Sequence, residues 1–363
     1  MAEKTEKVVT TTKTVTTTTV TETTETKKKS GWWSGLKTAA KIALIAGGTL
    51  VLAGAVLLIV FGRAKNVSDS MESTIAQNSK VFFNRFKTPE TLDIVVFRHP
   101  ETDSVVPSAP KSNYYKSARQ FGEDWCRQNE VVYQKFKRRP VYISRVYGTP
   151  GSLVEIKDNT VFINHAAIPD PNGVKYQYIV SNDRLGGVFP ADSLGIPRED
   201  MKGESDFAED YMKLYINRVP AGSNLAIYCM TENSAQKLSR FSIINKVEKI
   251  VLPKDFAVST VFPYQASRGW NSSNMGPLIV PQKGKVVKLS VNTLPVYRRC
   301  IEAYEENKVE VKGKDIFING QLADSYRFKM DYYFVVGDNR AGKDDSRYFG
   351  FLPENHVLGT ACE

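Results

Sequence analysis

Histidine and cysteine, which often carry acid–base, redox and metal chemistry, are scarce in this sequence. Among its 363 residues are three histidines and four cysteines. Gaps of 103, 71 and 62 residues separate the cysteines, so no pair has the spacing of a zinc site or a Cys-Xaa-Xaa-Cys redox centre. None of His99, His165 and His356 has an obvious serine and carboxylate partner for a Ser-His-Asp triad, and we interpret all three as surface residues. We therefore predict neither a metal site nor a cofactor.

The positive charge is too dilute to indicate a nucleic-acid partner. The formal net charge is +10, from 49 Lys and Arg against 39 Asp and Glu. Residues 1–41 hold eight Lys and four Glu, so the rest of the chain carries only +6. A nucleic-acid-binding domain concentrates positive charge more strongly than this. Hydrophobic residues make up 42% of the chain, which suffices for a sizeable core and excludes a chain that is disordered throughout.

The N-terminal residues have the composition of a disordered tail. The first 26 residues contain 13 Thr, interleaved with Val, Lys and Glu, without apolar periodicity or turn signals. We predict a disordered cytoplasmic tail over residues 1–30 and a membrane anchor over residues 31–62.

An uncharged apolar run from Ile42 to Phe61 predicts one transmembrane helix. Its 20 residues would reach about 30 Å as a helix, the thickness of a hydrocarbon core. Trp32 and Trp33 precede the run, where interfacial aromatic residues are expected. The run is too long, and begins too far into the chain, for a cleaved signal peptide. A buried core helix is the other alternative.

Basic residues are more frequent before this run than after it. Only Arg63 and Lys65 follow it closely. Five lysines precede it: Lys27, Lys28, Lys29, Lys37 and Lys41. The positive-inside rule therefore predicts a single-pass protein with its N-terminus in the cytoplasm and residues 63–363 outside.

Beyond the apolar run the sequence predicts a mainly β structure. Short runs of β-branched and aromatic residues are bounded by Gly, Pro, Asn or Asp, as β-strands commonly are. The clearest are Asp93–Arg98, Val154–Lys157, Thr160–Asn164 and Phe334–Val336. Phe121, Trp125 and Val132 have helix-like spacing, which predicts a helix near residues 114–136.

Two segments repeat each other without gaps at an offset of 155 residues. Val154–Asn164 reads VEIKDNTVFIN, and Val309–Asn319 reads VEVKGKDIFIN. Each segment predicts a β-hairpin with an Asp-Asn or Gly-Lys turn. The repeat is either a duplication or two hairpins of one sheet. It extends weakly upstream, where residues 141–142 match residues 296–297.

The repeats suggest a division of the exported part into three regions. We expect a first β core over residues 63–170, with the helical insertion near residues 114–136 inside it. A loop-rich region, residues 171–284, separates the two repeats and reads as an inserted variable region. A second β core follows over residues 285–363.

Three segments beyond the apolar run carry the candidate chemistry. They are Ser68-Asp69-Ser70-Met71, the Gly-Thr-Pro-Gly turn of residues 148–151, and the long run GDNRAGKDDSR of residues 337–347. In this order behind one membrane helix, the segments resemble type I signal peptidases, membrane-bound Ser/Lys endopeptidases that remove signal peptides. The resemblance covers roughly residues 40–165 and 260–363 and is to the long Gram-negative form.

The resemblance implies a fold, an activity and a location. The fold is a pair of largely antiparallel β domains of the signal peptidase type behind a single N-terminal transmembrane helix. The activity is cleavage of the signal peptides of exported proteins, so the implied partners are signal peptides and the lipid bilayer. The implied location is the inner (cytoplasmic) membrane, with the catalytic region on the periplasmic side and a role in protein secretion.

Carried over residue by residue, the resemblance implies a site. Ser70 matches the nucleophile, and Ser68 with the backbone N–H of Ser70 matches the oxyanion hole. Asp345 and Arg347 match a buried structural ion pair. The walls of the small subsites that accept an Ala-Xaa-Ala signal end match four residues: Met71, Ile75, Tyr142 and Ile143.

The sequence departs from the family where the general base is expected. The base lysine of the family falls on Ser144, and the serine that contacts that lysine falls on Lys343. Other conserved-box positions are also replaced, by Ser73, Asn78, Ser79 and Ser152. A serine hydroxyl is a poor nucleophile without a base. A free lysine is only about 0.04% neutral at pH 7, so a lysine base needs a site built to desolvate it.

Two hypotheses follow from this exchange. In the first, Lys343 is desolvated, is held by Ser144 and serves as the base for Ser70 in a rearranged Ser-Lys dyad. In the second, the chain is a catalytically inactive pseudo-peptidase that acts as a signal-peptide-binding or scaffold subunit, as the replaced box residues suggest. A purely structural β-protein would leave the run of residues 337–347 unexplained.

Overall fold

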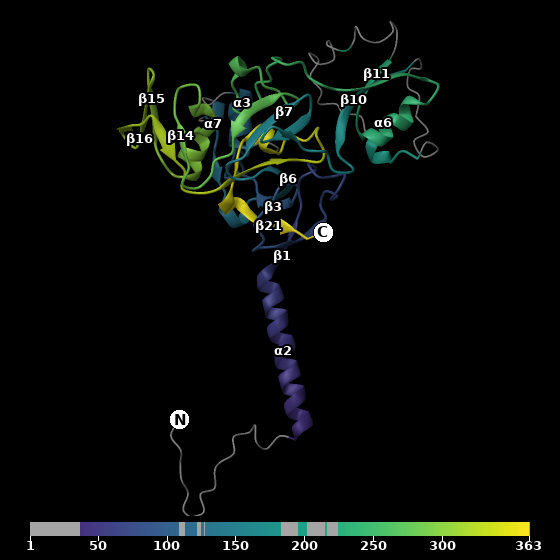
Figure 1. Ribbon diagram of the computed structural model, residues 1–363, viewed down its shortest axis with the longest axis vertical. Helices are drawn as coiled ribbons and strands as arrows, with labels where there is room; N and C mark the ends of the chain where they lie inside the picture. Colours follow the sequence, from purple (N-terminus) through teal and green to yellow (C-terminus); the bar gives the residue numbers. More distant parts are fainter. Residues whose placement is uncertain are drawn as a thin grey trace, which may run out of the picture. The chain divides into compact units, whose positions relative to one another are not determined.

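The computed structural model describes residues 37–108, 113–121, 125–126, 128–182, 195–201, 215 and 224–362 (Figure 1). The chain divides into two compact units, Met1–Ile59 and Val60–Glu363. The predicted disordered tail over residues 1–30 lies outside the described residues. Within the second unit, β15 and β16 lie at one side and β10, β11 and α6 at the other (Figure 1).

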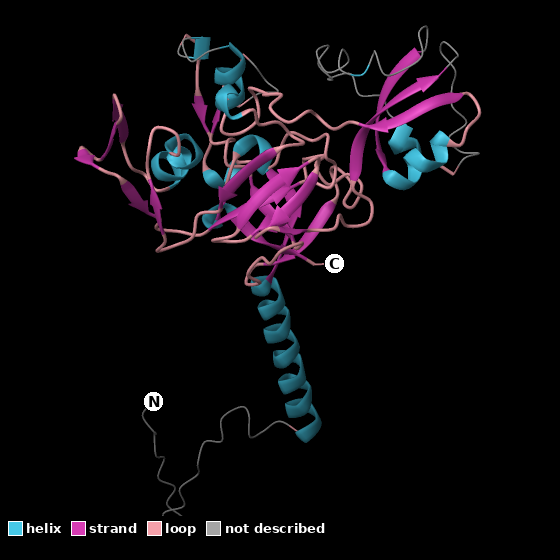
Figure 2. Ribbon diagram, turned by 45° about the horizontal axis from the view of Figure 1, so that its top comes forward, coloured by secondary structure: helices cyan, strands magenta, loops and turns pink. Residues whose placement is uncertain are grey.

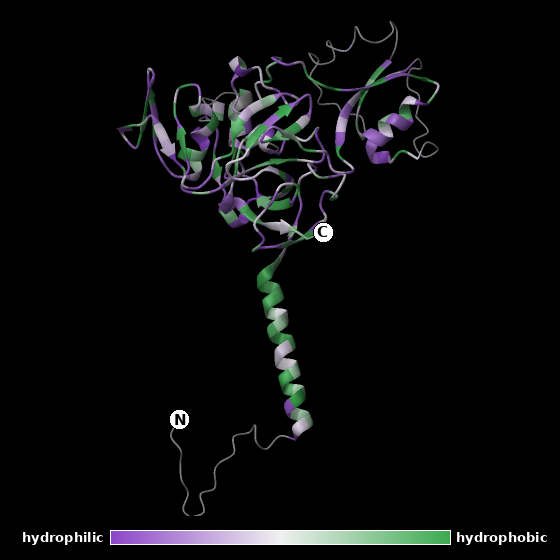
Figure 3. Ribbon diagram, in the orientation of Figure 1, coloured by the Kyte–Doolittle hydropathy of each residue, from purple (hydrophilic) through white to green (hydrophobic). Residues whose placement is uncertain are grey.

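The first unit contains one long apolar helix, α2 (Thr38–Val60). Its 23 residues would extend about 34 Å, enough to cross a membrane, and none of them is buried. Apolar residues occupy the helix along its length (Figure 3). The prediction of a membrane-crossing helix is therefore confirmed in length and composition, and the buried-core alternative has no support. The helix begins four residues before Ile42 and ends at Val60, because Phe61 starts a strand.

A seven-stranded antiparallel sheet forms the middle of the second unit, in the order β1-β2-β21-β3-β6-β19-β20. Its strands are β1 (Phe61–Lys65), β2 (Lys80–Asn84), β3 (Ile94–Arg98), β6 (Val141–Gly148), β19 (Tyr332–Val336), β20 (Leu352–Pro353) and β21 (Val357–Ala361). Nearly all residues of β3 and β19 are buried, as expected for strands that are covered on both faces. The prediction of a mainly β, antiparallel structure is confirmed.

A second sheet packs over the main core. It has the order β13-β7-β8-β9 and comprises β7 (Leu153–Lys157), β8 (Thr160–Ile163), β9 (Ala166–Ala167) and β13 (Met275–Ile279). Alternate residues of β7 and β8 are buried, and Val154, Ile156 and Val161 join the largest apolar cluster. Alternating burial is typical of a half-covered antiparallel sheet.

The sequence repeat forms the same three-stranded unit twice. The second copy consists of β15 (Val309–Lys312), β16 (Asp315–Ile318) and β17 (Gln321–Leu322), matching β7, β8 and β9. In each copy an asparagine side chain closes the unit: Asn164 Oδ1 accepts from Leu153 N, and Asn319 Oδ1 accepts from Lys308 N, both at 2.9 Å. The copies belong to different sheets, so the alternative of two hairpins in one sheet is wrong.

The weak upstream extension of the repeat is not structural. Residues 141–142 begin strand β6, whereas residues 296–297 lie in a helix, α7 (Leu294–Arg299). A proline at the second position of α7 starts that helix, and the π-helical turn Cys300–Tyr304 continues it.

A third sheet, in the order β11-β10-β12, packs its own small core against α6 (Figure 2). Its elements are β10 (Lys175–Asn182), β11 (Asn224–Thr231), α6 (Glu232–Ser239) and β12 (Ile244–Lys249). Thr231 caps α6 by accepting a hydrogen bond from Ser234 N. All three strands fall in the predicted inserted region, residues 171–284. The same range also contains β13, which pairs with β7 in the second sheet.

The remaining elements are short. The paired strands are β4 (Ser104–Val105) with β5 (Val132–Tyr133), and β14 (Val286–Lys288) with β18 (Ser325–Arg327). The helices are α3 (Tyr114–Phe121) and α8 (Ser346–Phe349). Single 3-10 turns cover Phe136–Arg138, Arg198–Met201, Ala266–Arg268 and Glu354–His356.

The helix predicted near residues 114–136 is correct only over its first part. The helix α3 ends at Phe121, and residues that were expected to continue it form β5 instead. Val131, Val132 and Tyr133 all favour extended structure, and β5 pairs with β4. A pairing partner far along the chain therefore decided the conformation of this segment.

Two of the three histidines were placed wrongly on the surface. His99 is 1% exposed and His356 is 7% exposed, whereas His165 is exposed. The His99 ring packs between Tyr142 and Phe349, with ring centroids 4.8 Å from each. The cause is aromatic packing from strand β6 and helix α8, which the local sequence around His99 does not reveal.

Candidate active site

Ser70 lies in the segment that connects β1 to β2, and its side chain is fully buried. Its Oγ donates a hydrogen bond of 2.7 Å to the carbonyl oxygen of Ile143 in β6. The Ser144 Oγ donates to the same carbonyl oxygen at 2.8 Å. Two serine hydroxyls therefore share one acceptor, at the place where the resemblance predicts a nucleophile and an amine. No amine, imidazole or carboxylate of the described residues is hydrogen-bonded to Ser70 Oγ.

The backbone around Ser70 is held by side chains next to it. The Ser70 N–H donates to Ser68 Oγ at 3.0 Å. The Asn66 side chain donates to Ser68 O at 2.7 Å and accepts from Ser68 N at 3.1 Å. The two groups expected in the oxyanion hole, the Ser70 N–H and the Ser68 hydroxyl, are thus bonded to each other. An oxyanion would have to replace Ser68 Oγ as the acceptor of the Ser70 N–H.

The segment before Ser70 lies directly against the edge of β6. Val67 N donates to Val141 O at 3.1 Å, next to the bond from Ser70 to Ile143. On its other side β6 pairs with β3, and β19 pairs with β6 only from Arg145 onward. At the start of β6, one edge is therefore not paired with any strand, and the residues preceding Ser70 cover it. An extended peptide could pair with this edge only after displacing that segment.

Three of the four predicted subsite residues lie together. Met71 and Ile143 are fully buried in one apolar cluster, and the partly buried Ile75 packs against it. Tyr142 instead packs against a different cluster, which contains Phe97. Neighbouring residues of a strand point to opposite faces of the sheet, so Tyr142 and Ile143 cannot line the same pocket with their side chains.

Asp345 and Arg347 form a buried ion pair, with 2.8 Å between Arg347 Nη2 and Asp345 Oδ2. Asp345 also accepts from Gly337 N and caps α8, and Arg347 donates to the carbonyl oxygens of Arg340 and Gly342. Burial alone would lower the pKa of the Arg347 guanidinium, but the adjacent Asp345 carboxylate raises it above its ordinary value. The pair fixes the conformation of the run of residues 337–347.

A second buried pair, which the sequence analysis did not find, joins this run to β6 and to the serine segment. Arg145 binds Asp338 in a bidentate manner, with Nε to Oδ1 at 2.9 Å and Nη2 to Oδ2 at 2.6 Å. Thr74 Oγ1 donates to the same carboxylate at 2.6 Å. The pair joins residues 193 positions apart. The only signal for it in the sequence is that Arg145 follows the predicted base position and Asp338 follows Gly337.

A glycine allows the run to approach Ser70. A Cβ atom on Gly337 would lie 2.5 Å from the carbonyl oxygen of Ser70, which no larger residue could tolerate without a shift. Asn339 N donates to the same oxygen at 2.9 Å. The backbone of residues 337–342 is therefore in direct contact with the candidate nucleophile.

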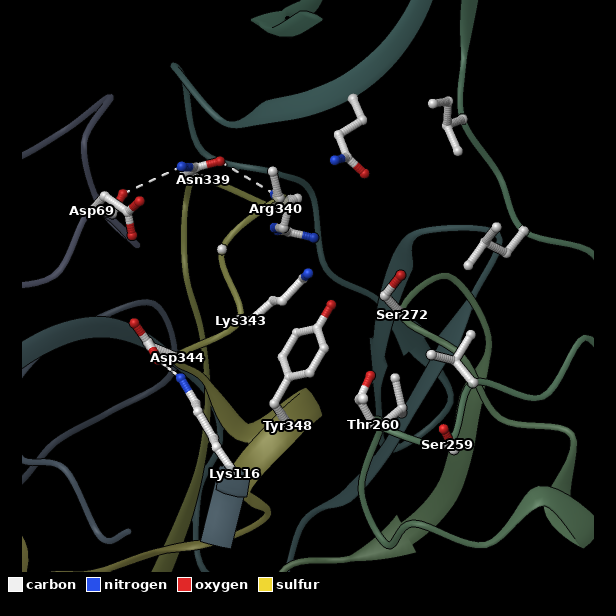
Figure 4. Close-up of a pocket in the computed structure, with 17 residues that line it drawn as sticks. Asp69, Lys116, Ser259, Thr260, Ser272, Asn339, Arg340, Lys343, Asp344 and Tyr348 are labelled. Carbon is white, nitrogen blue, oxygen red and sulfur yellow. Dashed lines mark hydrogen bonds and ion pairs between the residues drawn. The ribbon is translucent and has the colours of Figure 1, made fainter. Parts of the chain in front are cut away.

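Lys343 follows this contact but does not reach Ser70. It is exposed, and it makes no hydrogen bond or ion pair with another described residue. Its side chain points into a cavity beside Arg340 and Tyr348 (Figure 4). The cavity has a volume of about 540 Å³, and neither Ser70 nor Ser144 lines it. The structure does not bring the Lys343 amine together with the two serines.

Titratable groups near the site are perturbed by burial. Burial lowers the pKa of His99 to about 4, against its ordinary value of 6.5, so the imidazole is neutral at pH 7. Burial and the nearby Asp344 carboxylate raise the pKa of Asp69. Among the described residues, no group of three or more His, Cys, Asp or Glu side chains could hold a metal ion.

Comparisons with known proteins identify a family for this chain. A family model described as signal peptidase, peptidase S26, matches residues 39–245 and 280–362. Signal peptidase I of Buchnera aphidicola subsp. Schizaphis graminum is 39% identical over 56 residues, which cover 13% of this chain and 18% of that protein. Probable signal peptidase I-2 of Synechocystis sp. is 27% identical over 101 residues, covering 22% of this chain and 46% of that protein. The matches thus span less than half the length of either relative.

Proposed function

This chain belongs to the signal peptidase family, peptidase S26, and from that membership we propose that it binds signal peptides of exported proteins without cleaving them by Ser/Lys chemistry. One observation carries the proposal. The Ser70 hydroxyl donates its proton to the Ile143 carbonyl oxygen, and the residue at the family's base position is Ser144. The scaffold around the nucleophile is present, while the base is replaced by a second hydroxyl.

The chemistry of the two serines supports binding over hydrolysis. A serine attacks a carbonyl only when a neighbouring base takes its proton, and general bases contribute about 10²–10⁴-fold to such steps. A main-chain carbonyl accepts a hydrogen bond but does not remove a proton from an alcohol. Ser144 has no basic atom either. The two serine hydroxyls can therefore hydrogen-bond to a peptide end, but nothing in the pair can remove the proton from Ser70.

The location proposed for this function is the inner (cytoplasmic) membrane. The helix α2 supports a single membrane anchor, and the lysines before it support a cytoplasmic N-terminus. Residues 63–363 would then lie on the periplasmic, or extracytoplasmic, side in contact with the bilayer surface. Ser70 follows the end of α2 by only ten residues of chain, and this short spacing supports a substrate that is inserted in the same bilayer.

The proposed mode of binding is addition of an extended peptide to the edge of β6 that the residues preceding Ser70 now cover. Main-chain hydrogen bonds to residues 141–143 would give affinity, after the segment with Val67 moves away. Met71, Ile75 and Ile143 form a tightly packed apolar cluster at this edge, which supports preference for the small apolar side chains of an Ala-Xaa-Ala end.

A peptidase that uses Lys343 is the second candidate. It is favoured by the backbone contact: a Cβ on Gly342 would lie 3.5 Å from Ser70 Cα, and Lys343 is the next residue. Its amine has no anionic partner among the described residues. This candidate requires the Lys343 side chain to leave the cavity and replace the Ile143 carbonyl as the partner of Ser70 Oγ.

A binding and product assay separates the two candidates. The full chain in detergent is titrated into a fluorescent peptide that ends its signal part in Ala-Xaa-Ala, with anisotropy for binding and mass spectrometry for products. Saturable binding without product supports the proposal, and a peptide with Trp at both small positions should not bind. Product that disappears in Lys343→Ala would support the second candidate, and absence of binding would overturn both.

A further inference from the structure

The cavity beside Ser70 has one wall that lies outside the two ranges matched by the family model. One side is formed by residues 339–344 and Tyr348, which lie in the part that the family model matches. The opposite side is formed by residues 250, 252, 258–261 and 272, and these fall between the two matched ranges (Figure 4). A site that uses this wall would give the chain a specificity beyond that of the family scaffold.

The cavity contains one cation without a counter-charge among the described residues. Lys116 pairs with Asp344 at 2.8 Å, and Arg340 pairs with Asp170 at 2.6 Å. Lys343 has no such partner, and its amine projects into the space (Figure 4).

Four hydroxyl side chains line the same cavity, those of Ser259, Thr260, Ser272 and Tyr348, together with the carboxylates of Asp69 and Asp344. An ammonium with surrounding hydroxyl donors matches a carboxylate better than any neutral or cationic group.

The position of the cavity relates it to a peptide held at Ser70. Ser70 Oγ faces β6, where the end of the signal peptide is proposed to bind. The opposite side of Ser70 contacts the cavity wall, because Asn339 N donates to Ser70 O at 2.9 Å and Gly342 packs against Ser70 Cα. Asp69, the residue before Ser70, also lines the cavity. The cavity therefore lies on the side of Ser70 away from β6, where residues of a bound polypeptide beyond its signal end could reach it.

We propose that the cavity binds an acidic side chain of the polypeptide that follows the signal peptide, with Lys343 as the recognising cation. This inference rests on the proposed function, because it needs a signal-peptide end at Ser70. It assigns the unpaired lysine to substrate recognition and gives Lys343 no part in proton transfer.

The test compares three peptides on the full chain in detergent. All have the same Ala-Xaa-Ala signal end and an amidated C-terminus, which removes the terminal carboxylate as a ligand, and they continue with Glu-Glu, Gln-Gln or Lys-Lys. The Glu-Glu peptide should bind about 1.5- to 5-fold more tightly than the Gln-Gln peptide, the scale of one exposed ion pair. The Lys-Lys peptide should bind more weakly than either, and added salt should narrow the differences.

Variants of one position make the assignment specific. Lys343→Gln should abolish the preference for Glu-Glu, Lys343→Glu should reverse it towards Lys-Lys, and Lys343→Arg should retain it. Lys308→Gln is the matched control, because Lys308 is an exposed lysine directly before β15. This variant should also retain the preference for Glu-Glu.

Two results would overturn the inference. If all three peptides bind equally, or if Lys343→Gln keeps the preference, the cavity does not read an acidic residue, although the proposed binding function stands. If no peptide binds at all, the proposed function fails and this inference fails with it.

Discussion

The Ser70 hydroxyl donates its hydrogen bond, 2.7 Å long, to the main-chain carbonyl oxygen of Ile143. This contact ties the candidate nucleophile to the strand edge on which a peptide is proposed to bind. It has two consequences. Ser70 has no base, and the edge of β6 is closed by the chain's own residues, including Val67, which donates to Val141 O.

The closed edge predicts an unusual effect of removing the serine hydroxyl. In Ser70→Ala, the Ile143 carbonyl loses one donor, and the segment that covers the edge is held by fewer hydrogen bonds. A net hydrogen bond contributes about 0.5–1.5 kcal/mol, so peptide affinity should rise about 2- to 10-fold. Fluorescence anisotropy with an Ala-Xaa-Ala peptide measures this change.

Ser79→Ala is the matched control for that experiment. The Ser79 hydroxyl donates to Ala76 O in the same segment, away from β6, and its loss should leave affinity unaltered. A fall in affinity of tenfold or more in Ser70→Ala would mean that the hydroxyl contacts the peptide directly, contrary to the closed edge.

The buried pair of Asp345 and Arg347 predicts a large loss of stability. Arg347→Met would leave the Asp345 carboxylate buried without its partner, which costs about 3–5 kcal/mol of unfolding free energy. The double variant Asp345→Ala with Arg347→Met should lose less than Arg347→Met alone, because no charge is then left unpaired. Urea unfolding followed by tryptophan fluorescence measures both.

Lys308→Met provides the comparison for the buried pair. Lys308 pairs with Glu310 at 2.6 Å, but both side chains are exposed, so the unfolding midpoint should stay close to that of the wild type. An Arg347→Met protein that is as stable as the wild type would show that the pair does not fix the run of residues 337–347.

The local parts of the fold could be predicted because local sequence specifies them. The turn of the first hairpin contains Asp158 and Asn159 with φ of 49° and 69°, and Gly313 in the second has φ of 62°. Asp, Asn and Gly tolerate such angles, so the pattern of strand, turn and strand was readable in both repeats. The apolar helix α2 was equally readable from length and composition.

The parts that depend on distant contacts could not be predicted. The Arg145–Asp338 pair joins two segments that neither periodicity nor spacing brings together. The placement of Lys343 is set by the backbone of Gly342, which packs on Ser70 and directs the next side chain into the cavity. The exchanged residue types at positions 144 and 343 suggested that the two side chains are in contact. Two positions can exchange residue types without such a contact.

The buried histidines predict that the protein becomes less stable in mild acid. Burial lowers the pKa of His99 to about 4 and that of His356 to about 3. As the pH falls, both histidines therefore bind protons in the unfolded chain before they do so in the folded protein. The unfolded state then holds more protons below pH 6.5, and stability falls as the pH falls. Between pH 6.5 and 5 each histidine should cost about 1.5 kcal/mol.

Histidine variants test whether the buried histidines cause the loss of stability between pH 6.5 and 5. His99→Phe keeps a ring between Tyr142 and Phe349 but cannot be protonated, so the loss of stability between pH 6.5 and 5 should be smaller than in the wild type. His165→Gln, at an exposed histidine, should leave the pH dependence as it is. Equal pH dependence in His99→Phe and the wild type would contradict this explanation.

The lysines before α2 predict the orientation of the chain. A phosphatase that is active only outside the cytoplasm, fused after Glu363, should be active, and a reporter that is active only in the cytoplasm should be silent there. Replacing the five preceding lysines by glutamine should reduce the outside fraction. A cytoplasmic reporter that is active after Glu363 would show that the orientation is inverted.

Cleavage of an Ala-Xaa-Ala preprotein by the wild type and by Ser144→Lys with Lys343→Ser tests the central claim most directly. The double variant restores the amine next to Ser70, in the buried setting beside Ile143 that can lower a lysine pKa. The wild type should give no product above a Ser70→Ala background, and the double variant should cleave at least about 100-fold faster than the wild type. Efficient cleavage by the wild type that is lost in Lys343→Ala would contradict the claim.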